Sequence, residues 1–166
     1  MKRLLVVLLC FLLVGCSYTK EERPASFYYV PADYIHALSG SMLESEIRET
    51  VHLQTTQEIL QHYLEGPENP RFHNPFPAGC RLIAYDLKEG TATVVISKEL
   101  AQLSGTDLPL ACAALAMTCS DLTGAEAVRI RTQFATLAGK QEVFLTRDML
   151  LLLLDPDSVF NSQYNE

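Results

Sequence analysis

Apolar residues recur at two different spacings along the chain, and the change of spacing predicts a mixture of strands and helices. Short stretches rich in β-branched and aromatic residues, bounded by glycine or proline, are typical of strands. The stretch within residues 42–51 is ambiguous, because its glutamates leave a helix open as the alternative. The predicted strands cover residues 27–30, part of 42–51, 81–85, 91–96, 127–131 and 142–145, and the two that flank the turn at Gly90 form a hairpin.

A first helix is predicted from Thr55, which forms a Thr-x-x-Glu capping box with Glu58. The apolar residues that follow fall on one helical face, and Gly66 ends the helix. The next segment cannot continue a helix or lie centrally in a sheet, because proline lacks the backbone donor that both need. This segment is predicted to be a loop, and its four prolines are Pro67, Pro70, Pro75 and Pro77.

A second helix is predicted over residues 108–122, with Thr106 or Asp107 as its N-terminal cap and Gly124 just after its last turn. This helix is apolar nearly all the way round, whereas a helix on a sheet needs only one apolar stripe. One interpretation is that its small residues form an association surface for a second copy or a related protein. The alternative is that alanine, the best helix former, is simply tolerated on an exposed face.

The order β, β, α, β, β, α, β, β predicts an α+β fold: a single domain with a mostly antiparallel sheet and two helices packed on one face. We place this domain at residues 27–154. The apolar run at residues 149–154 is too short to span a bilayer and is expected to pack on the domain. Residues 155–166 are predicted to be a polar C-terminal tail.

The amino terminus has the anatomy of a signal peptide: Lys2 and Arg3 precede an unbroken apolar run over residues 4–14. The run ends in Leu-Val-Gly-Cys, which resembles the bacterial lipobox, so residues 1–15 are predicted to be a cleaved lipoprotein signal and Cys16 to carry lipid. An ordinary secretory signal is the alternative. Residues 16–26 are then a lipid-anchored tether, and the chain is expected at the extracytoplasmic face of the cell membrane.

The charge of the chain excludes one class of partner. Cleavage before Cys16 removes Lys2 and Arg3, which shifts the formal charge from −7 to −9. An acidic surface is poorly suited to binding a phosphate backbone, so no nucleic acid is expected as a partner. The membrane is expected to be held through the lipid, since two acyl chains bind a bilayer far more strongly than one.

Three cysteines remain in the mature fold, namely Cys80, Cys112 and Cys119. Cys112 and Cys119 lie seven residues apart in a helix, roughly 10.5 Å along its axis, which is beyond the reach of a disulfide. Cys80 could pair with either. The favoured interpretation is three buried thiols that act as small hydrophobes, because the second helix contains no Lys or Arg that would stabilise a thiolate.

No pattern in the sequence predicts catalysis, a cofactor or a metal site. The four histidines, His36, His52, His62 and His73, form no ligand pair of the His-x-x-Glu-His type. A site built from His62, His73 and Cys80 is a weaker alternative to surface histidines. Serines lack a Gly-x-Ser-x-Gly elbow, and the tail aspartates Asp155 and Asp157 lack the glycine and glutamate of a calcium loop. The chain is therefore expected not to be an enzyme.

Three segments together resemble the GerM domain, named from a bacterial sporulation and germination lipoprotein. They are the helix end and turn at residues 63–67 and 75–80, the segment at residues 90–100, which is similar to the family's Gly-x-Ala-x-Val-Asp-Leu-Ser-Lys-Glu-Phe pattern, and the second helix with the strand after it. Val95 stands where the family usually has aspartate, and Cys80 where it usually has threonine.

The resemblance implies a fold akin to the ring-building modules of sporulation complexes, and a function in assembly or binding at the cell envelope. Contacts are expected through a sheet edge, the second helix or the proline-rich loop. The alternative is a lipoprotein that binds the cell wall or a small ligand. In that case Phe27, Tyr28 and Tyr29, or the loop around Phe72 and Phe76, would stack on sugar or peptide.

Overall fold

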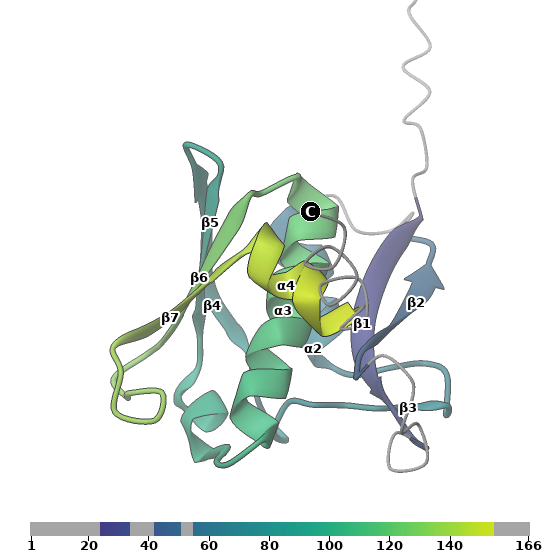
Figure 1. Cartoon of the computed structure of the whole chain (residues 1–166), viewed down its shortest axis with the longest axis horizontal. Helices are drawn as coiled ribbons and strands as arrows, with labels where there is room; N and C mark the ends of the chain where they lie inside the picture. The colour runs from purple at the N-terminus through teal and green to yellow at the C-terminus, as the bar shows by residue number, and fades with distance from the viewer. Residues whose placement is uncertain (1–23, 34–41, 51–54, 155–166) are drawn as a thin grey trace, which may run out of the picture.

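Two sheets form where the sequence places its β-branched and aromatic runs, and they lie on opposite sides of one central helix (Figure 1). The computed structural model describes residues 24–33, 42–50 and 55–154. The strands are β1 (Ala25–Pro31), β2 (Glu44–Arg48), β3 (Phe72–His73), β4 (Leu82–Lys88), β5 (Thr91–Ile96), β6 (Ala127–Thr132) and β7 (Glu142–Thr146). The helices are α2 (Thr56–Leu64), the 3-10 helix η1 (Lys98–Gln102), α3 (Asp107–Thr123) and α4 (Arg147–Leu154).

The α+β class is confirmed, and the strands divide into two sheets. One sheet has the order β2-β1-β3 and the other β4-β5-β6-β7. All strand pairs are antiparallel except β5 with β6, which run parallel because η1 and α3 connect them. The predicted hairpin is confirmed as β4 and β5, and the ambiguous stretch within residues 42–51 is a strand, β2.

Helix α2 begins with the predicted capping box. The Thr55 hydroxyl accepts from the Glu58 amide at 3.2 Å, and the Glu58 carboxylate accepts from the Thr55 amide at 3.1 Å. Its buried face consists of Leu60, Tyr63 and Leu64. Gly66 follows with φ at +113°, a conformation that side chains resist, so the glycine is required where the chain leaves the helix.

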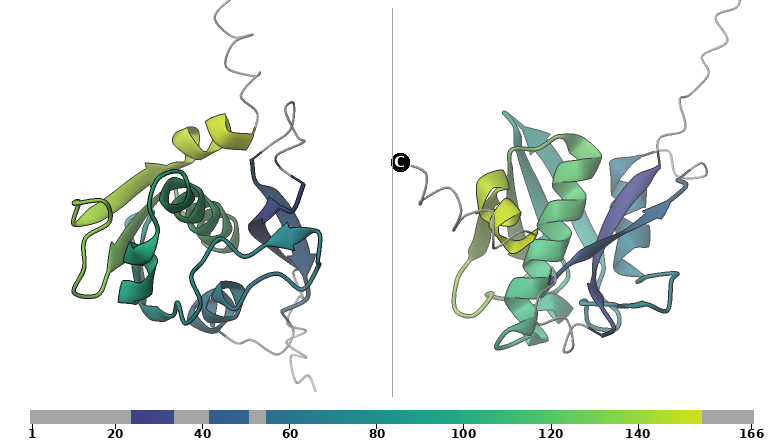
Figure 2. Two further views of the ribbon diagram at one scale, coloured as in Figure 1. Left: turned by 90° about the horizontal axis from the view of Figure 1, so that it is seen from below. Right: turned by 45° about the vertical axis from the view of Figure 1, so that its right-hand side comes forward.

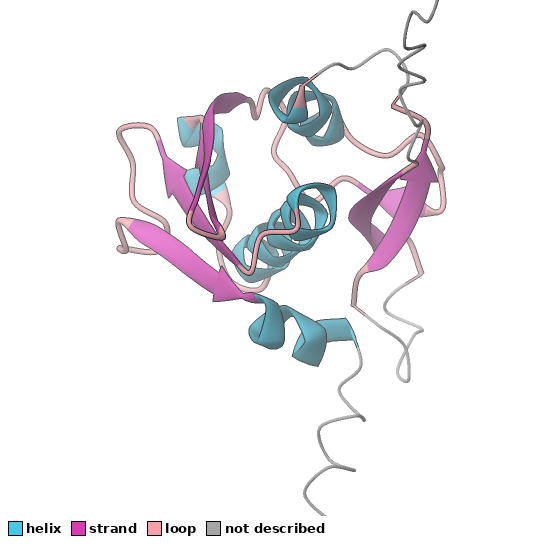
Figure 3. Ribbon diagram, turned by 90° about the horizontal axis from the view of Figure 1, so that it is seen from above, coloured by secondary structure: helices cyan, strands magenta, loops and turns pink. Residues whose placement is uncertain are grey.

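Helix α3 is buried on every side through its middle turns, so its small residues do not form the association surface that one interpretation expected there, and association itself stays a prediction. The four-stranded sheet covers one side of α3, and β1 covers another (Figure 2; Figure 3). On the β1 side, the Tyr28 amide donates to the Thr118 hydroxyl at 2.9 Å. Every residue from Ala111 to Ser120 is buried, so the small side chains let two layers of strand approach one helix.

The aromatic residues that were candidates for ligand stacking form the core instead. Tyr63 of α2 stacks on Phe27 with ring centroids 5.6 Å apart and contacts Tyr29 at 5.0 Å and Phe76 edge-on at 5.2 Å. Phe72 completes the cluster, and only the nearby Tyr28 is partly exposed. The ligand-stacking interpretation is therefore wrong for Phe27, Tyr29, Phe72 and Phe76, whose rings lie in the core.

The first and last elements of the described chain, β1 and α4, test the predicted limits of the tether and of the domain. Strand β1 begins at Ala25, so the last two residues of the predicted tether belong to the sheet. The first two residues of the predicted apolar run differ: Leu150 of α4 joins the core, whereas Met149 is 52% exposed. Within the residues described, no helix is long and apolar enough to cross a membrane. The predicted signal peptide, Cys16 and the polar tail lie outside the described residues.

Candidate binding surfaces

A buried charge organises one side of the domain. Arg48, at the end of β2, is 7% exposed, and its Nε donates to the Glu46 carboxylate at 2.8 Å. Its Nη2 donates to the Tyr29 hydroxyl and to the Gly66 carbonyl, both at 2.9 Å, and also to Glu46. The guanidinium lies over the Phe27 ring, 4.8 Å from its centroid. Arg48 thus joins β2, β1 and the end of α2.

Glu46 extends the same network to the proline-rich loop. It is 8% exposed, and its carboxylate accepts from the Asn69 amide at 2.6 Å and from the Glu68 amide at 3.3 Å. The loop is held again where the Asn74 side chain donates to the Leu64 carbonyl at 3.3 Å. These contacts hold the start of the loop against β2 and α2, which explains why its phenylalanines lie in the core rather than at the surface.

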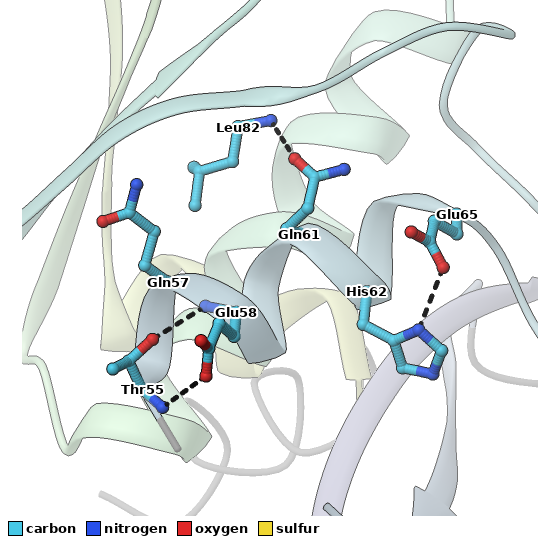
Figure 4. A pocket seen from close by; sticks show the side chains of 7 residues that line it. All are labelled: Thr55, Gln57, Glu58, Gln61, His62, Glu65 and Leu82. Atoms are coloured by element: carbon cyan, nitrogen blue, oxygen red, sulfur yellow. Dashed lines mark hydrogen bonds and ion pairs between the residues drawn. The ribbon is translucent and has the colours of Figure 1, made fainter. Parts of the chain in front are cut away.

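An open pocket of about 580 Å³ lies along the exposed face of α2 (Figure 4). Its walls are mostly amides and carboxylates, and its one apolar residue is Leu82 at the start of β4. The Gln61 side chain fixes this strand to the helix, because it accepts from the Leu82 amide at 2.9 Å. The pocket is lined by Thr55, Gln57, Glu58, Gln61, His62, Glu65 and Leu82.

His62 lies at one end of this pocket between two carboxylates. Its Nδ1 is 3.0 Å from Glu65, and its Nε2 is 3.7 Å from Glu68. His73 lies on β3, and the described part of the chain contains no group of three potential metal ligands. The alternative metal site with Cys80 therefore has no counterpart here. His36 and His52 lie outside the described residues.

The face of the four-stranded sheet that points away from α3 carries alternating polar and charged side chains. On β6 and β7, Arg131 pairs with Glu142 at 2.6 Å, and Arg129 lies 3.3 Å from the same carboxylate. The Arg129 guanidinium also covers the Phe144 ring at 5.7 Å. Val95, where the family pattern has aspartate, pairs with Arg131 on this face. The face therefore presents arginines paired with a glutamate, with Val95 and Phe144 beside them.

The β6–β7 loop (residues 133–141) presents an aromatic side chain to solvent. Phe134 is 95% exposed and has φ at +59°, a conformation that is an outlier for a bulky residue. The loop around it is well built: Leu137 is buried and exchanges backbone hydrogen bonds with Lys140 at 2.8 and 3.0 Å. The Thr132 hydroxyl donates to the Ala135 carbonyl at 2.7 Å. The tip is thus fixed from both sides.

The three cysteines are free and buried, as predicted. Burial raises the pKa of the Cys112 thiol to about 12 and that of the Cys119 thiol to about 12. Burial also raises the pKa of Cys80 to about 11, and the charge of Glu99 adds to the effect. These thiols are protonated at neutral pH, which removes the nucleophilic form.

Sequence patterns located some of these surfaces and missed others. The capping box marked α2, and with it the helix that forms most of the pocket. The Arg48 network was missed because alternation along β2 is inverted: the two charged residues face inward and Ile47 is 69% exposed. Phe134 gave no signal, because a single aromatic residue between glutamine and alanine is compatible with a core position.

The fold and its surfaces define an α+β domain with a buried central helix, an open polar sheet face and a shallow pocket. A family model described as Germane, sporulation and spore germination, matches residues 26–133. No protein among the curated sequences matches the chain. The chain belongs to the Germane family, whose domain is of the GerM type.

Solved structures agree on the fold. The first GerMN domain of the sporulation protein GerM from Bacillus subtilis superposes with a TM-score of 0.57 at 15% identity, covering 76% of this chain and 98% of that one. The tandem GerMN domains of the same protein give a TM-score of 0.56 at 17% identity, covering 76% of this chain and 46% of that one. The described chain therefore corresponds to one such domain.

Proposed function

We propose that this chain is an extracytoplasmic lipoprotein, anchored by lipid on Cys16, whose GerM-type domain works by binding other envelope proteins in sporulation or germination and not by catalysis. The observation that carries the proposal is the combination of a lipobox ending at Cys16 with a domain of the sporulation and germination family. The acidic mature chain is consistent with a protein partner and not with nucleic acid.

The surfaces support binding over chemistry. The nucleophiles that the described residues could offer as thiols are buried and protonated, and His62 lies between two glutamates. By contrast, the outer face of the four-stranded sheet and the β6–β7 loop expose side chains of the kind that protein interfaces use, including arginine and phenylalanine.

Lipid anchoring is tested with Cys16→Ser in cells that produce the full-length chain. The natural chain should partition into the detergent phase and carry the mass of acyl groups on Cys16, while the variant should lose both properties. Phase partitioning and mass that do not change in the variant would refute the anchor.

Partner binding is tested by crosslinking the natural chain in intact cells and mapping the joined peptides. Crosslinks from the outer sheet face or the β6–β7 loop to envelope proteins, this chain included, support an assembly function. A binding function for the cell wall would point to the α2 pocket as a site, and retention on purified peptidoglycan that Gln57→Arg abolishes would favour it.

A further inference from the structure

The most exposed large apolar side chain on the domain stands at a fixed position. Phe134 is 95% exposed on a loop whose neighbours are tied down by a buried leucine and by three short hydrogen bonds. A left-handed conformation strains the backbone of a bulky residue, and residues strained in this way cluster at functional sites. A phenylalanine held out in this way is suited to entering a pocket on a partner.

A pocket of suitable size exists on the same domain. The α2 pocket measures about 580 Å³ and is open to solvent, with Leu82 and the methylene groups of Gln57 and Gln61 available to an aromatic ring. The amide and carboxylate groups around it match the exposed backbone and threonines of a loop tip. An aromatic anchor surrounded by polar contacts is the usual composition of an interface centre.

Charge favours the same pairing. The β6–β7 loop at residues 133–141 contains one basic side chain, Lys140, and no acidic one, a formal charge of +1, although the whole chain is acidic. Residues 55–68 contain three glutamates and neither lysine nor arginine, a formal charge of −3. Two such surfaces attract each other, while two copies of either one repel. This difference in charge favours contact between the loop of one copy and the α2 pocket of another.

The two surfaces are also placed compatibly. Leu82 pairs with Ile96, and Ile96 with Thr132, so the pocket and the β6–β7 loop lie at the same end of the four-stranded sheet but toward opposite edges of it, at β4 and at β6–β7. The start of β1 lies at the opposite end of the domain (Figure 1). Copies related by rotation about an axis that runs from one of these ends to the other would all place the start of β1 on the same side. Their tethers would then lead to one membrane.

We propose that the β6–β7 loop of one copy, with Phe134 at its centre and Lys140 beside it, docks into the α2 pocket of a second copy of this chain. The contact joins two different surfaces, so the first copy keeps its pocket free and the second keeps its loop free for further neighbours. This inference deepens the proposed assembly function by naming its partner as the chain itself and its contact as this pair of surfaces.

The test uses two differently tagged full-length chains produced in the same cells, one with Gln57→Cys and the other with Thr136→Cys. Both positions are exposed, and the natural cysteines of the described domain are buried, so mild oxidation should join only the introduced thiols. The expected result is a mixed-tag dimer. The matched control combines Gln57→Cys with Lys88→Cys, an exposed position at the other end of the sheet, and should give none.

Adding Phe134→Asn to the Thr136→Cys chain should reduce the dimer yield about 10- to 100-fold, the effect of losing one buried phenylalanine. Lys140→Glu and Glu65→Lys should each weaken the crosslink, and combining them across the contact should restore it in part. Equal dimer from both cysteine pairs, or a yield that Phe134→Asn leaves unchanged, would overturn the inference. So would a loss of vesicle binding to phosphatidylglycerol in Phe134→Asn with the crosslink intact, since the loop would then contact lipid.

Failure of this inference differs from failure of the proposed function. Amine crosslinking that joins copies of the natural chain while the cysteine pair stays unjoined would reject this contact and keep assembly. Crosslinks only to other envelope proteins would reject self-contact and keep a binding function. A Cys16→Ser chain that remains lipid-modified would contradict the anchor and leave the contact proposal standing.

Discussion

Two regions of this domain reverse the usual distribution of charge and aromatic surface. Around β2 a charged pair is buried: Arg48 is 7% exposed beneath the rings of Phe27 and Tyr29. On the β6–β7 loop the aromatic residue is outside, with Phe134 95% exposed. Residue type alone would place Arg48 at the surface and Phe134 in the core. The contacts that each side chain has in the fold determine where it lies.

Arg48 and Phe134 differ in the contacts that each makes within the domain. Arg48 makes hydrogen bonds with a carboxylate, a hydroxyl and a backbone carbonyl through Nε and Nη2, which offset most of the cost of its burial, and its removal would leave Glu46 buried with a charge. Phe134 is almost fully exposed and stacks on no other ring of the described domain, so water surrounds it. The first region is therefore expected to determine stability, and the second to determine association.

The largest effect is expected from Arg48→Leu. The substitution leaves the buried Glu46 carboxylate without its cation, which destabilises by about 3–5 kcal/mol in comparable cases. Arg71→Leu is the matched control, because Arg71 is exposed and lies 3.6 Å from Glu44, a surface pair worth about 1 kcal/mol or less. Urea unfolding measures both. Equal losses in the two variants would show that Arg48 is not the organising residue.

The buried thiols predict a pH dependence. Their folded-state pKa values are raised, so the unfolded chain deprotonates first, and the stability they contribute is full below pH 9 and is lost as pH rises toward 12. Between pH 8 and pH 10, the free energy of unfolding should fall by about 1.4 kcal/mol for each of Cys112 and Cys119. Urea unfolding at both pH values should show a smaller decline in a Cys112→Ala/Cys119→Ala chain. An identical decline would contradict the role of these thiols.

Sequence patterns predicted the elements well, because caps, turns and periodicity are local properties. The capping box at Thr55, the stop at Gly124 and the β4–β5 hairpin all depend on residues within a few positions of one another. What α3 contacts is not local: an all-round apolar helix fits an association surface as well as burial between two sheets. The position of β1 on its second side decides between them, and that requires the tertiary fold.

The candidate surfaces were less predictable for the same reason. The α2 pocket combines one helix with the start of β4, and its lining becomes visible only when Leu82 is placed beside Gln61. The residues of β2 alternate between charged and other side chains, yet nothing within the strand indicates that the charged Glu46 and Arg48 face inward. Asn69 and Gly66, which receive that face, are about twenty residues away.

A substitution at Gly66 is expected to have a smaller effect than Arg48→Leu. It tests the turn after α2, whose Gly66 carbonyl accepts a hydrogen bond from Arg48. Gly66→Val should destabilise by about 1–3 kcal/mol, because φ is +113° and a Cβ there would lie 2.8 Å from the Asn74 Nδ2 atom. Gly79→Val is the control: its φ is +81°, but a Cβ meets nothing within 4 Å. Thermal unfolding should show a greater loss at Gly66. An equal loss would mean that backbone strain alone, and not the approach of Asn74, limits this position.

The smallest effect on stability is expected at Phe134, and its sign is the informative part. Phe134→Asn replaces a residue strained at φ +59° by one that tolerates this conformation, and it removes no buried contact. The free energy of unfolding should therefore stay constant or rise by up to about 1 kcal/mol. Phe144→Asn makes the same exchange on β7, where Phe144 is 45% exposed and lies under the Arg129 guanidinium. There the change should cost about 1 kcal/mol, since asparagine is unfavourable in strands and the ring contact is lost. Urea unfolding of both variants under one set of conditions gives the comparison. If Phe134→Asn destabilises as much as Phe144→Asn, the Phe134 ring supports the fold, and its exposure no longer marks it as a residue kept for a partner.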